Sequence, residues 1–154
     1  MPSHRSTSSF GKRQEYIAVA ELLKRGYDVY MTLVDDQQID CVVRFEGDPP
    51  AYIDLQIKAR ARTAKNPGTF SALVINKPRP GFFYIFYSEL VDTYWVVPSM
   101  DFAEGKLGRK NKTGENAGAY SIVFVNRSNG RPRPSLDRYK GRFDLLAPQA
   151  AVKG

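Results

Sequence analysis

Residues 51–60 have the sequence AYIDLQIKAR, in which apolar and polar side chains alternate. Successive side chains of a β-strand point to opposite faces of its sheet, so this pattern predicts a strand with two different faces. The apolar face, which we expect to pack on a core, comprises Ile53, Leu55 and Ile57. The polar face comprises Asp54, Gln56, Lys58 and Arg60. An ordinary half-buried strand, with its polar side chains in water, would show the same alternation.

The preceding apolar run carries a carboxylate, which favours a functional interpretation of the polar face. Residues 39–45 (IDCVVRF) are predicted to form a strand that contains Asp40. Aspartate is uncommon in β-strands, and a buried charge is costly unless it is paired or bound to a metal ion. If the two strands are neighbours, Asp40 lies beside Gln56 and Lys58. A carboxylate, an amide oxygen and an ammonium group would then converge.

A helix is predicted over residues 10–25, where apolar side chains recur at helical spacing. Ser8 or Ser9 can cap its N-terminus, and Gly26 lies where a C-terminal glycine is common. The apolar stripe comprises Tyr16, Ala18, Val19, Ala20, Leu22 and Leu23. Glu15 lies either within this stripe or just beyond its edge. Within the stripe it would be a charge on the buried side, where a solvated residue is not expected.

These residue types match the requirements of metal-assisted phosphodiester cleavage. A hard cation such as Mg²⁺ takes oxygen ligands from one or two carboxylates and keeps several waters. Cleavage needs an activated water and neutralisation of the developing charge, and a nearby lysine can orient that water. Asp40, Gln56 and Lys58 supply such a set, with Glu15 or Asp54 as a further acid.

The composition gives no support to several other chemistries. The chain has one cysteine, Cys41, and one histidine, His4, so an internal disulfide, a cysteine-rich zinc site and thiol chemistry are not indicated. Gly47 and Gly68 are isolated and do not form a phosphate-binding loop. Residues 1–9 lack the apolar core of a secretory signal, and no window approaches the roughly eighteen apolar residues of a spanning helix. We therefore expect a cytoplasmic protein without membrane association.

The net charge of +7 is concentrated in the second half of the chain. Residues 105–143 hold ten basic and two acidic side chains, a net charge of +8. A nucleic acid would profit from such a surface, because neutralised phosphates release counterions. A solvated face is the alternative. The side chains that we expect to contact nucleic acid are Arg60, Arg62, Lys65, Lys110, Lys112, Arg131 and Arg133.

The other predicted elements complete one mixed β-sheet flanked by helices, of the α+β or α/β class. Further strands are expected at residues 27–34, 70–75, 81–88, 93–97 and 119–125. A turn at 35–37 would join the strand at 27–34 to the strand at 39–45. A short helix is expected at 98–105 and a closing helix at 136–146. Residues 82–87 suit a central strand buried on both faces, and Trp95 suits the core. A single domain over residues 10–150 would follow a disordered leader at 1–9.

The quoted residues resemble a known group of nucleases. Residues 11–30 (GKRQEYIAVAELLKRGYDVY) look like the opening helix of archaeal Holliday-junction-resolvase-like endonucleases. Ile39-Asp40 and Gln56-Ile57-Lys58 fall where the PD-(D/E)XK superfamily has its metal-binding aspartate and its acid-x-lysine pair. The resemblance covers residues 10–62 and implies a restriction-endonuclease-like core.

In that resemblance Asp40 is the principal metal ligand, Lys58 holds the attacking water and Glu15 is the helix-borne acid. The departure is Gln56, where the superfamily usually has Glu or Asp. One negative charge is missing, so Mg²⁺ would bind more weakly unless Asp54 on the same face compensates.

Three functions remain open at this point. The first is a Mg²⁺- or Mn²⁺-dependent endonuclease that hydrolyses DNA, with branched DNA as one candidate substrate and a homodimer expected by analogy. The second is a module that kept the fold, binds nucleic acid and cuts nothing. The third is an interaction subunit with no nucleic-acid role.

Overall fold

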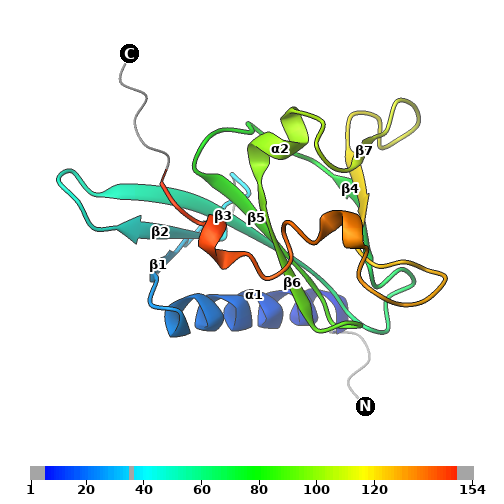
Figure 1. Ribbon diagram of the computed structural model, residues 1–154, viewed down its shortest axis with the longest axis horizontal. Coiled ribbons are helices and arrows are strands. Elements are labelled where there is room, and N and C mark those ends of the chain that lie inside the picture. The colour runs from blue at the N-terminus through cyan, green and yellow to red at the C-terminus, as the bar shows by residue number, and fades with distance from the viewer. Residues whose placement is uncertain (1–5, 35–36, 149–154) are drawn as a thin grey trace.

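A five-stranded mixed sheet with the strand order β1-β2-β3-β5-β6 forms the centre of the protein (Figure 1). The computed structural model describes residues 6–34 and 37–148. The strands are β1 (Asp28–Met31), β2 (Cys41–Phe45), β3 (Ala51–Arg60), β5 (Phe82–Ser88) and β6 (Thr93–Pro98). β3 and β5 are parallel, and the other neighbouring pairs of this sheet are antiparallel.

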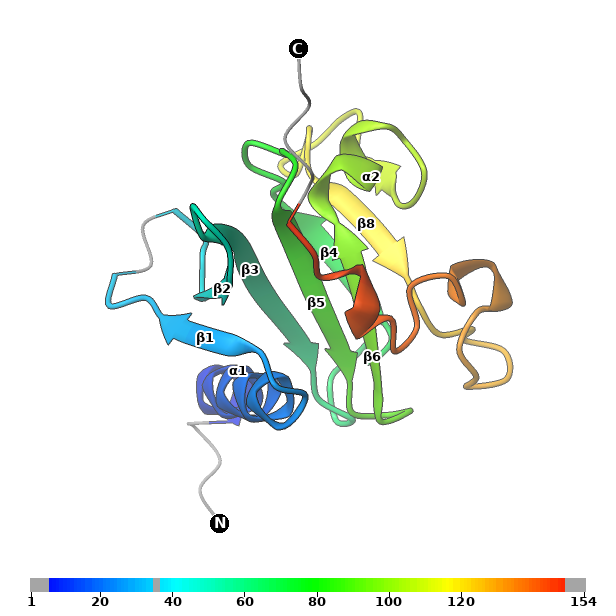
Figure 2. The ribbon, with the colours of Figure 1, turned by 60° about the vertical axis from the view of Figure 1, so that its left-hand side comes forward.

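Two further layers cover the central sheet, one on each face. The helix α1 (Ser6–Lys24) packs on one face. The other face is covered by the short helix α2 (Ser99–Ala103) and by a second sheet with the order β4-β8-β7. Its strands are β4 (Thr69–Leu73), β7 (Arg109–Lys110) and β8 (Tyr120–Val123). Figure 2 shows α1 beneath β1 and β3, and β8 beyond β6 on the far side of the molecule. This mixed sheet flanked by helices confirms the predicted fold class.

The alternation in β3 has the predicted structural consequence. Ile53, Leu55 and Ile57 are buried against α1, in one cluster with Ala18 and Leu22. All seven residues of β5 are buried, which confirms the prediction of a central strand. Trp95 of β6 lies in the core on the opposite face, and Cys41 is fully buried, both as expected.

α1 begins earlier than predicted and ends as predicted. It begins at Ser6, so the proposed N-cap serines, Ser8 and Ser9, lie inside the helix. Residues 6–9 of the predicted disordered leader are therefore helical. At the other end Gly26 adopts a φ of +90°, a conformation that favours glycine, and its N–H donates to the carbonyl of Leu23.

The buried stripe of α1 is rotated relative to the prediction. The predicted members Ala18, Val19 and Leu22 are buried, and they share the stripe with Phe10 and Gln14. The other predicted members, Tyr16, Ala20 and Leu23, are exposed. The helix thus presents the row formed by residues 10, 14, 18 and 22 to the sheet, and the small side chain of Ala18 lets its backbone approach the strands.

The prediction of a closing helix at residues 136–146 is wrong. This segment contains two short 3₁₀ turns, η1 (Pro134–Leu136) and η2 (Phe143–Leu145). Between them the backbone runs beside β6, where Val96 donates to the carbonyl of Tyr139 and Gly141 donates to the carbonyl of Tyr94. Gly141 has a φ of +64°, which interrupts a helix. Pairing with β6 therefore overrides the helical spacing of the apolar residues.

Several predicted strands are longer than the observed ones. β1 ends at Met31 and β2 begins at Cys41, so Asp40 directly precedes its strand. β4 ends at Leu73, after a register shift next to Ala72. β8 is likewise shorter than the strand predicted at 119–125. Residues 1–5 of the leader, 35–36 of the turn and 149–150 of the domain lie outside the described residues. In the described part of the chain, α1 and α2 are too short or too polar to cross a membrane.

Candidate active site

Asp40 lies at the point where β2 and β3 separate, and its side chain bridges them. Its Oδ2 accepts a hydrogen bond of 2.6 Å from the backbone nitrogen of Ile57, and its own N–H donates to the carbonyl of Leu55. The β2–β3 ladder begins at Cys41 paired with Leu55, so beyond that pair β2 offers no acceptor to the N–H of Ile57. The buried carboxylate of Asp40, 8% exposed, takes that place.

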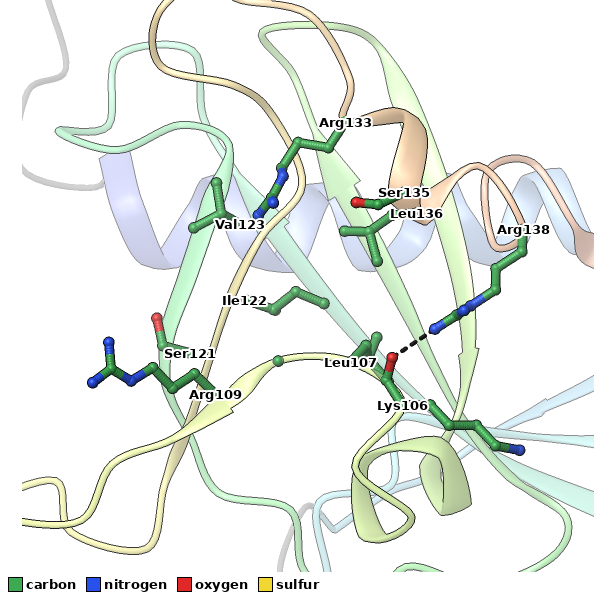
Figure 3. A pocket seen from close by; sticks show the side chains of 11 residues that line it. Lys106, Leu107, Arg109, Ser121, Ile122, Val123, Arg133, Ser135, Leu136 and Arg138 are labelled. Carbon is green, nitrogen blue, oxygen red and sulfur yellow. Dashed lines mark hydrogen bonds between the residues drawn. The ribbon is translucent and has the colours of Figure 1, made fainter.

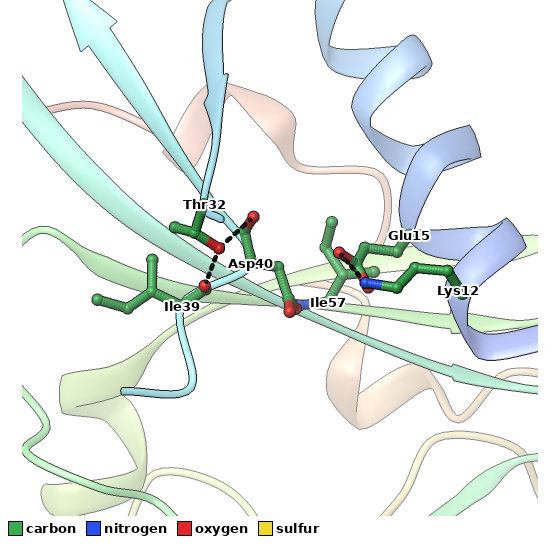
Figure 4. Close-up of polar contacts among 6 residues, drawn as sticks. All are labelled: Lys12, Glu15, Thr32, Ile39, Asp40 and Ile57. Carbon is green, nitrogen blue, oxygen red and sulfur yellow. Dashed lines mark hydrogen bonds and ion pairs between the residues drawn. The ribbon is translucent and has the colours of Figure 1, made fainter. Parts of the chain in front are cut away.

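The backbone of Asp40 is held on its other side by the chain that follows β1. The hydroxyl of Thr32 donates to the carbonyls of Ile39 and Asp40, at 2.7 and 3.2 Å (Figure 4). The N–H of Thr32 also donates to the carbonyl of Asp40. Asp40 is thus fixed between two strands, as a residue of a preorganised site must be. The sequence offered no local signal for the part of Thr32.

Glu15 approaches the same region from α1. Its side chain is 14% exposed, so it lies on the buried side of the helix and not beyond the edge of the stripe. Lys12, which is exposed, forms an ion pair of 3.3 Å with it (Figure 4). The hydrogen bond and the charge of Glu15 raise the pKa of Lys12, and Asp40 adds a smaller contribution.

Cys41 provides a second indication that the two acids are close together. Burial is the main cause that raises the pKa of its thiol to about 12, and the charges of Asp40 and Glu15 raise it further. Both carboxylates therefore act on one buried sulfur, although one comes from a helix and the other from the end of a loop.

Gln56 contributes a buried amide oxygen directly before Ile57, the residue that donates to Asp40. The residue precedes Ile57 in β3 and is 5% exposed. Its Oε1 is buried and has no hydrogen-bond partner among the described residues. The neighbouring residue on β5 is Tyr84, whose buried hydroxyl also lacks a partner in the described part of the chain. A bound cation or a hydrogen bond donated by Tyr84 would satisfy the Gln56 oxygen.

Lys58 lies two residues further along β3 and opens onto a pocket. The pocket has a volume of about 260 Å³, and Gln38 and the β4 residues Phe70–Leu73 also line it. Lys58 is half-buried and makes no hydrogen bond or ion pair with any of the described residues. Its ammonium group is thus available to a group that enters the pocket. Gln38 and Ser71 were not singled out from the sequence, because only the fold brings them to Lys58.

Two residues of the predicted polar face have structural partners instead. Asp54 forms an ion pair of 2.6 Å with Arg79, so the structure does not bring its carboxylate to Asp40 and Glu15. Arg60 donates to the carbonyl of Thr69 and lies over the ring of Phe70, which ties β3 to β4. The polar face of β3 therefore divides into a functional part and a structural part.

The remaining predicted nucleic-acid contacts are exposed on the side of the molecule that carries the second sheet. Arg62 and Lys65 follow β3, Lys110 and Lys112 belong to β7 and the loop after it, and Arg131 and Arg133 precede η1. None of these six forms an ion pair within residues 6–34 and 37–148. Figure 1 shows the loop after β7 on the opposite side of the central sheet from α1.

The donor set at Asp40 fits a hard cation. The candidate ligands Asp40, Glu15 and Gln56 offer oxygen atoms alone, from two carboxylates and from an amide whose Oε1 has no partner among the described residues. Across the described residues no group of three or more His, Cys, Asp or Glu side chains could hold a metal ion. These three side chains carry one negative charge fewer than a site with three carboxylates.

The chain has the fold of a known nuclease. Its structure is similar to that of a bacterial homing endonuclease, I-Ssp6803I, with a TM-score of 0.62 and 21% sequence identity. The match covers 92% of this chain and 93% of the endonuclease. No protein-family model and no curated protein sequence matches the chain.

Proposed function

We propose that this protein is a metal-dependent endonuclease that hydrolyses phosphodiester bonds of DNA. The observation that carries the proposal is the hydrogen bond from Ile57 to Asp40, because Ile57 lies between Gln56 and Lys58 in β3 of a chain with a nuclease fold. The structurally similar protein is a homing endonuclease, which supports DNA as the substrate class. The spacing of the three residues supports a site of the PD-(D/E)XK type.

Each side chain has a distinct part in the proposed reaction. Asp40, Glu15 and Gln56 would hold Mg²⁺ or Mn²⁺. When bound, the cation would neutralise charge on the scissile phosphate and acidify a water molecule. Lys58 would orient the attacking water and stabilise the charge that develops on the phosphoryl oxygens. The tie between Asp40 and Ile57 keeps the carboxylate in place before substrate arrives, which reduces the reorganisation needed during the reaction.

Cleavage of DNA by matched variants tests the proposal. Wild-type protein would be incubated with supercoiled plasmid and with a synthetic four-way junction, in Mg²⁺, Mn²⁺ or EDTA. We expect cleavage that requires the cation and that Asp40→Ala and Lys58→Ala each reduce by about 100-fold or more. Asp28→Ala and Lys24→Ala, which change an exposed residue of the same type, should cleave like wild type. Cleavage that survives both site variants would contradict the proposal.

The products also report on the substrate and the assembly. A single site cuts one strand, so we propose that duplex DNA is cut by two copies of this chain acting as a homodimer. Linear product formed without accumulation of nicked plasmid supports that assembly. Preference for the junction over the plasmid would identify branched DNA as the substrate.

A non-catalytic DNA-binding module is the second candidate, and Gln56 favours it. The neutral amide supplies no charge to a cation, and its buried oxygen lies beside Tyr84, which could donate to it. This candidate predicts salt-dependent binding of DNA without cleavage in any divalent cation. It also predicts that Asp40→Ala leaves the affinity for Mn²⁺ unchanged.

A further inference from the structure

A basic pocket lies between the second sheet and η1, away from the candidate active site. Its volume is about 580 Å³. Arg133 and Ser135 line one side and Arg109 and Ser121 the other, while Arg138 lies beside Lys106 at a third edge (Figure 3). Ile122, Leu107 and Leu136 form an apolar floor. None of the eleven described residues that line this pocket is acidic.

Three arginines keep their positive charge unpaired at this pocket. Arg109 and Arg133 are exposed and form no ion pair within the described part of the chain. Arg138 is positioned by a hydrogen bond of 2.6 Å from its guanidinium to the neutral carbonyl of Lys106, and it forms no ion pair with the described residues. Lys106 differs, because its ammonium group pairs with Asp101 and Glu104. The guanidinium groups therefore set the electrostatic character of the pocket.

The strand register connects this pocket to the candidate active site. Phe70 of β4 pairs with Ile122 of β8, and both lie in the core. Ser121, the neighbour of Ile122, consequently faces away from the core, and Arg109 of β7 lies opposite Ser121. β4 itself lines the pocket of Lys58. The outer side of the β4-β8-β7 sheet thus extends from the β4 edge, next to the pocket of Lys58, to Arg109 at the β7 edge.

We propose that this outer surface is the path of the DNA backbone, and that Arg109 and Arg133 bind a phosphate group of the substrate away from the scissile bond. Guanidinium groups bind phosphate oxygens in a bidentate manner, and the hydroxyls of Ser121 and Ser135 offer further donors. Lys110, Lys112 and Arg131, which form no ion pair with the described residues, flank the pocket along the chain. The cations therefore form an extended surface that suits a polyanion better than one free phosphate. The inference rests on the proposed function, since it specifies where that substrate lies.

Salt-dependent binding of DNA tests the inference separately from catalysis. A labelled duplex would be titrated in EDTA over a series of salt concentrations, with wild type, Arg109→Gln/Arg133→Gln and the control Arg13→Gln/Lys24→Gln. The control removes the same charge from exposed positions of α1, on the other face of the central sheet. Each lost phosphate contact lowers the slope of log K against log salt by about 0.9. Because the two arginines share one phosphate, we expect a decrease of about 0.9 for the pocket variant and little change for the control.

A charge-conserving variant keeps the test decisive if the glutamine variant unfolds. Arg109→Lys/Arg133→Lys should retain the salt slope and bind more weakly, because lysine cannot form the bidentate contact. An unchanged affinity in this variant, or equal slopes in the glutamine variant and the control, would overturn the inference while leaving the proposed function intact. If the wild type shows no salt-dependent binding to the duplex, the proposed function itself fails. Weakening of wild-type binding by millimolar inorganic phosphate at constant ionic strength would assign the pocket to free phosphate instead.

Discussion

The carboxylate of Asp40 accepts a hydrogen bond of 2.6 Å from the backbone nitrogen of Ile57, seventeen residues further along the chain. This contact has two consequences. It closes the gap left where the β2–β3 ladder begins, and it holds a negative charge beside Gln56 and Lys58. A single side chain therefore contributes to the stability of the sheet and to the proposed active site.

The two contributions of Asp40 can be separated by two substitutions. Asp40→Ala removes the acceptor for a buried N–H, and we expect a loss of about 1–3 kcal/mol in the free energy of unfolding. Asp40→Asn keeps an acceptor oxygen and should cost less than about 1 kcal/mol, yet it should lose cleavage as completely as the alanine variant. Urea unfolding followed by fluorescence of Trp95, which is buried, measures the first quantity. Equal destabilisation by both variants would show that the contact to Ile57 is not what stabilises the protein.

We expect the buried amide of Gln56 to lower the free energy of unfolding. Its buried Oε1 lacks a partner within the described residues, and methionine of similar length removes that desolvated carbonyl. Gln56→Met should therefore unfold with a free energy equal to the wild type or up to about 1 kcal/mol higher, while cleavage is lost. The comparison variant is Tyr84→Phe. If Gln56 serves the metal, Tyr84→Phe retains cleavage, whereas a structural pair would make both substitutions destabilising.

The thiol of Cys41 should be unreactive in the folded protein. Its thiol pKa is raised from 9.0 to about 12, chiefly by burial, so almost no thiolate exists at about pH 8. We expect a thiol reagent to modify the native protein at the rate of unfolding only, and to modify the protein in urea at once. Rapid modification without urea would show that the region of Asp40 opens readily.

The same shift in pKa predicts a pH dependence of stability. The unfolded thiol loses its proton above its ordinary value of 9.0, whereas the folded thiol keeps it until about 12. The contribution of Cys41 to the free energy of unfolding is therefore constant below about pH 9. It falls as the pH rises from about 9 to about 12. Cys41→Ala should lack this part of the decrease, so the two unfolding free energies should converge or cross in that range.

Gly68 is predicted to be required for packing of the loop after β3. A Cβ at this position would collide with Cβ of Val125 and lie 2.7 Å from its Cγ2. We expect Gly68→Ala to lower the free energy of unfolding by about 1–3 kcal/mol. Gly11→Ala is the matched control, because nothing lies within 4 Å of its added Cβ and α1 should gain about 0.5–1 kcal/mol. The prediction fails if both variants are equally stable.

The parts of the fold that follow from local patterns were predicted correctly. The alternation of residues 51–60 identified β3 and its two faces, and the buried run at residues 82–87 identified β5. The pairing of β2 with β3 followed from assuming that successive strands pair. These features depend on periodicity and on contacts between neighbouring segments, both of which are readable from one sequence.

The parts that depend on distant contacts were not predictable in this way. Residues 136–146 have helical spacing of apolar side chains but pair with β6, which lies much earlier in the chain. The second sheet joins β4 to β8, which are separated by the whole of β5, β6 and α2, so neither its existence nor the pocket at Arg109 was visible. The division of the polar face of β3 was also hidden, because Asp54 and its partner Arg79 are distant in the sequence and meet only in the fold.

The most direct test of the central claim is a titration of Mn²⁺, followed by the loss of the paramagnetic signal of the free ion. The account predicts that wild-type protein binds Mn²⁺ and that Asp40→Asn abolishes this binding. Gln56→Glu, which restores the missing negative charge, should bind the cation more tightly than wild type. Asp28→Asn, on the neighbouring strand β1, should bind like wild type. Identical binding curves for wild type and Asp40→Asn would contradict the account and would favour a DNA-binding module without a metal site.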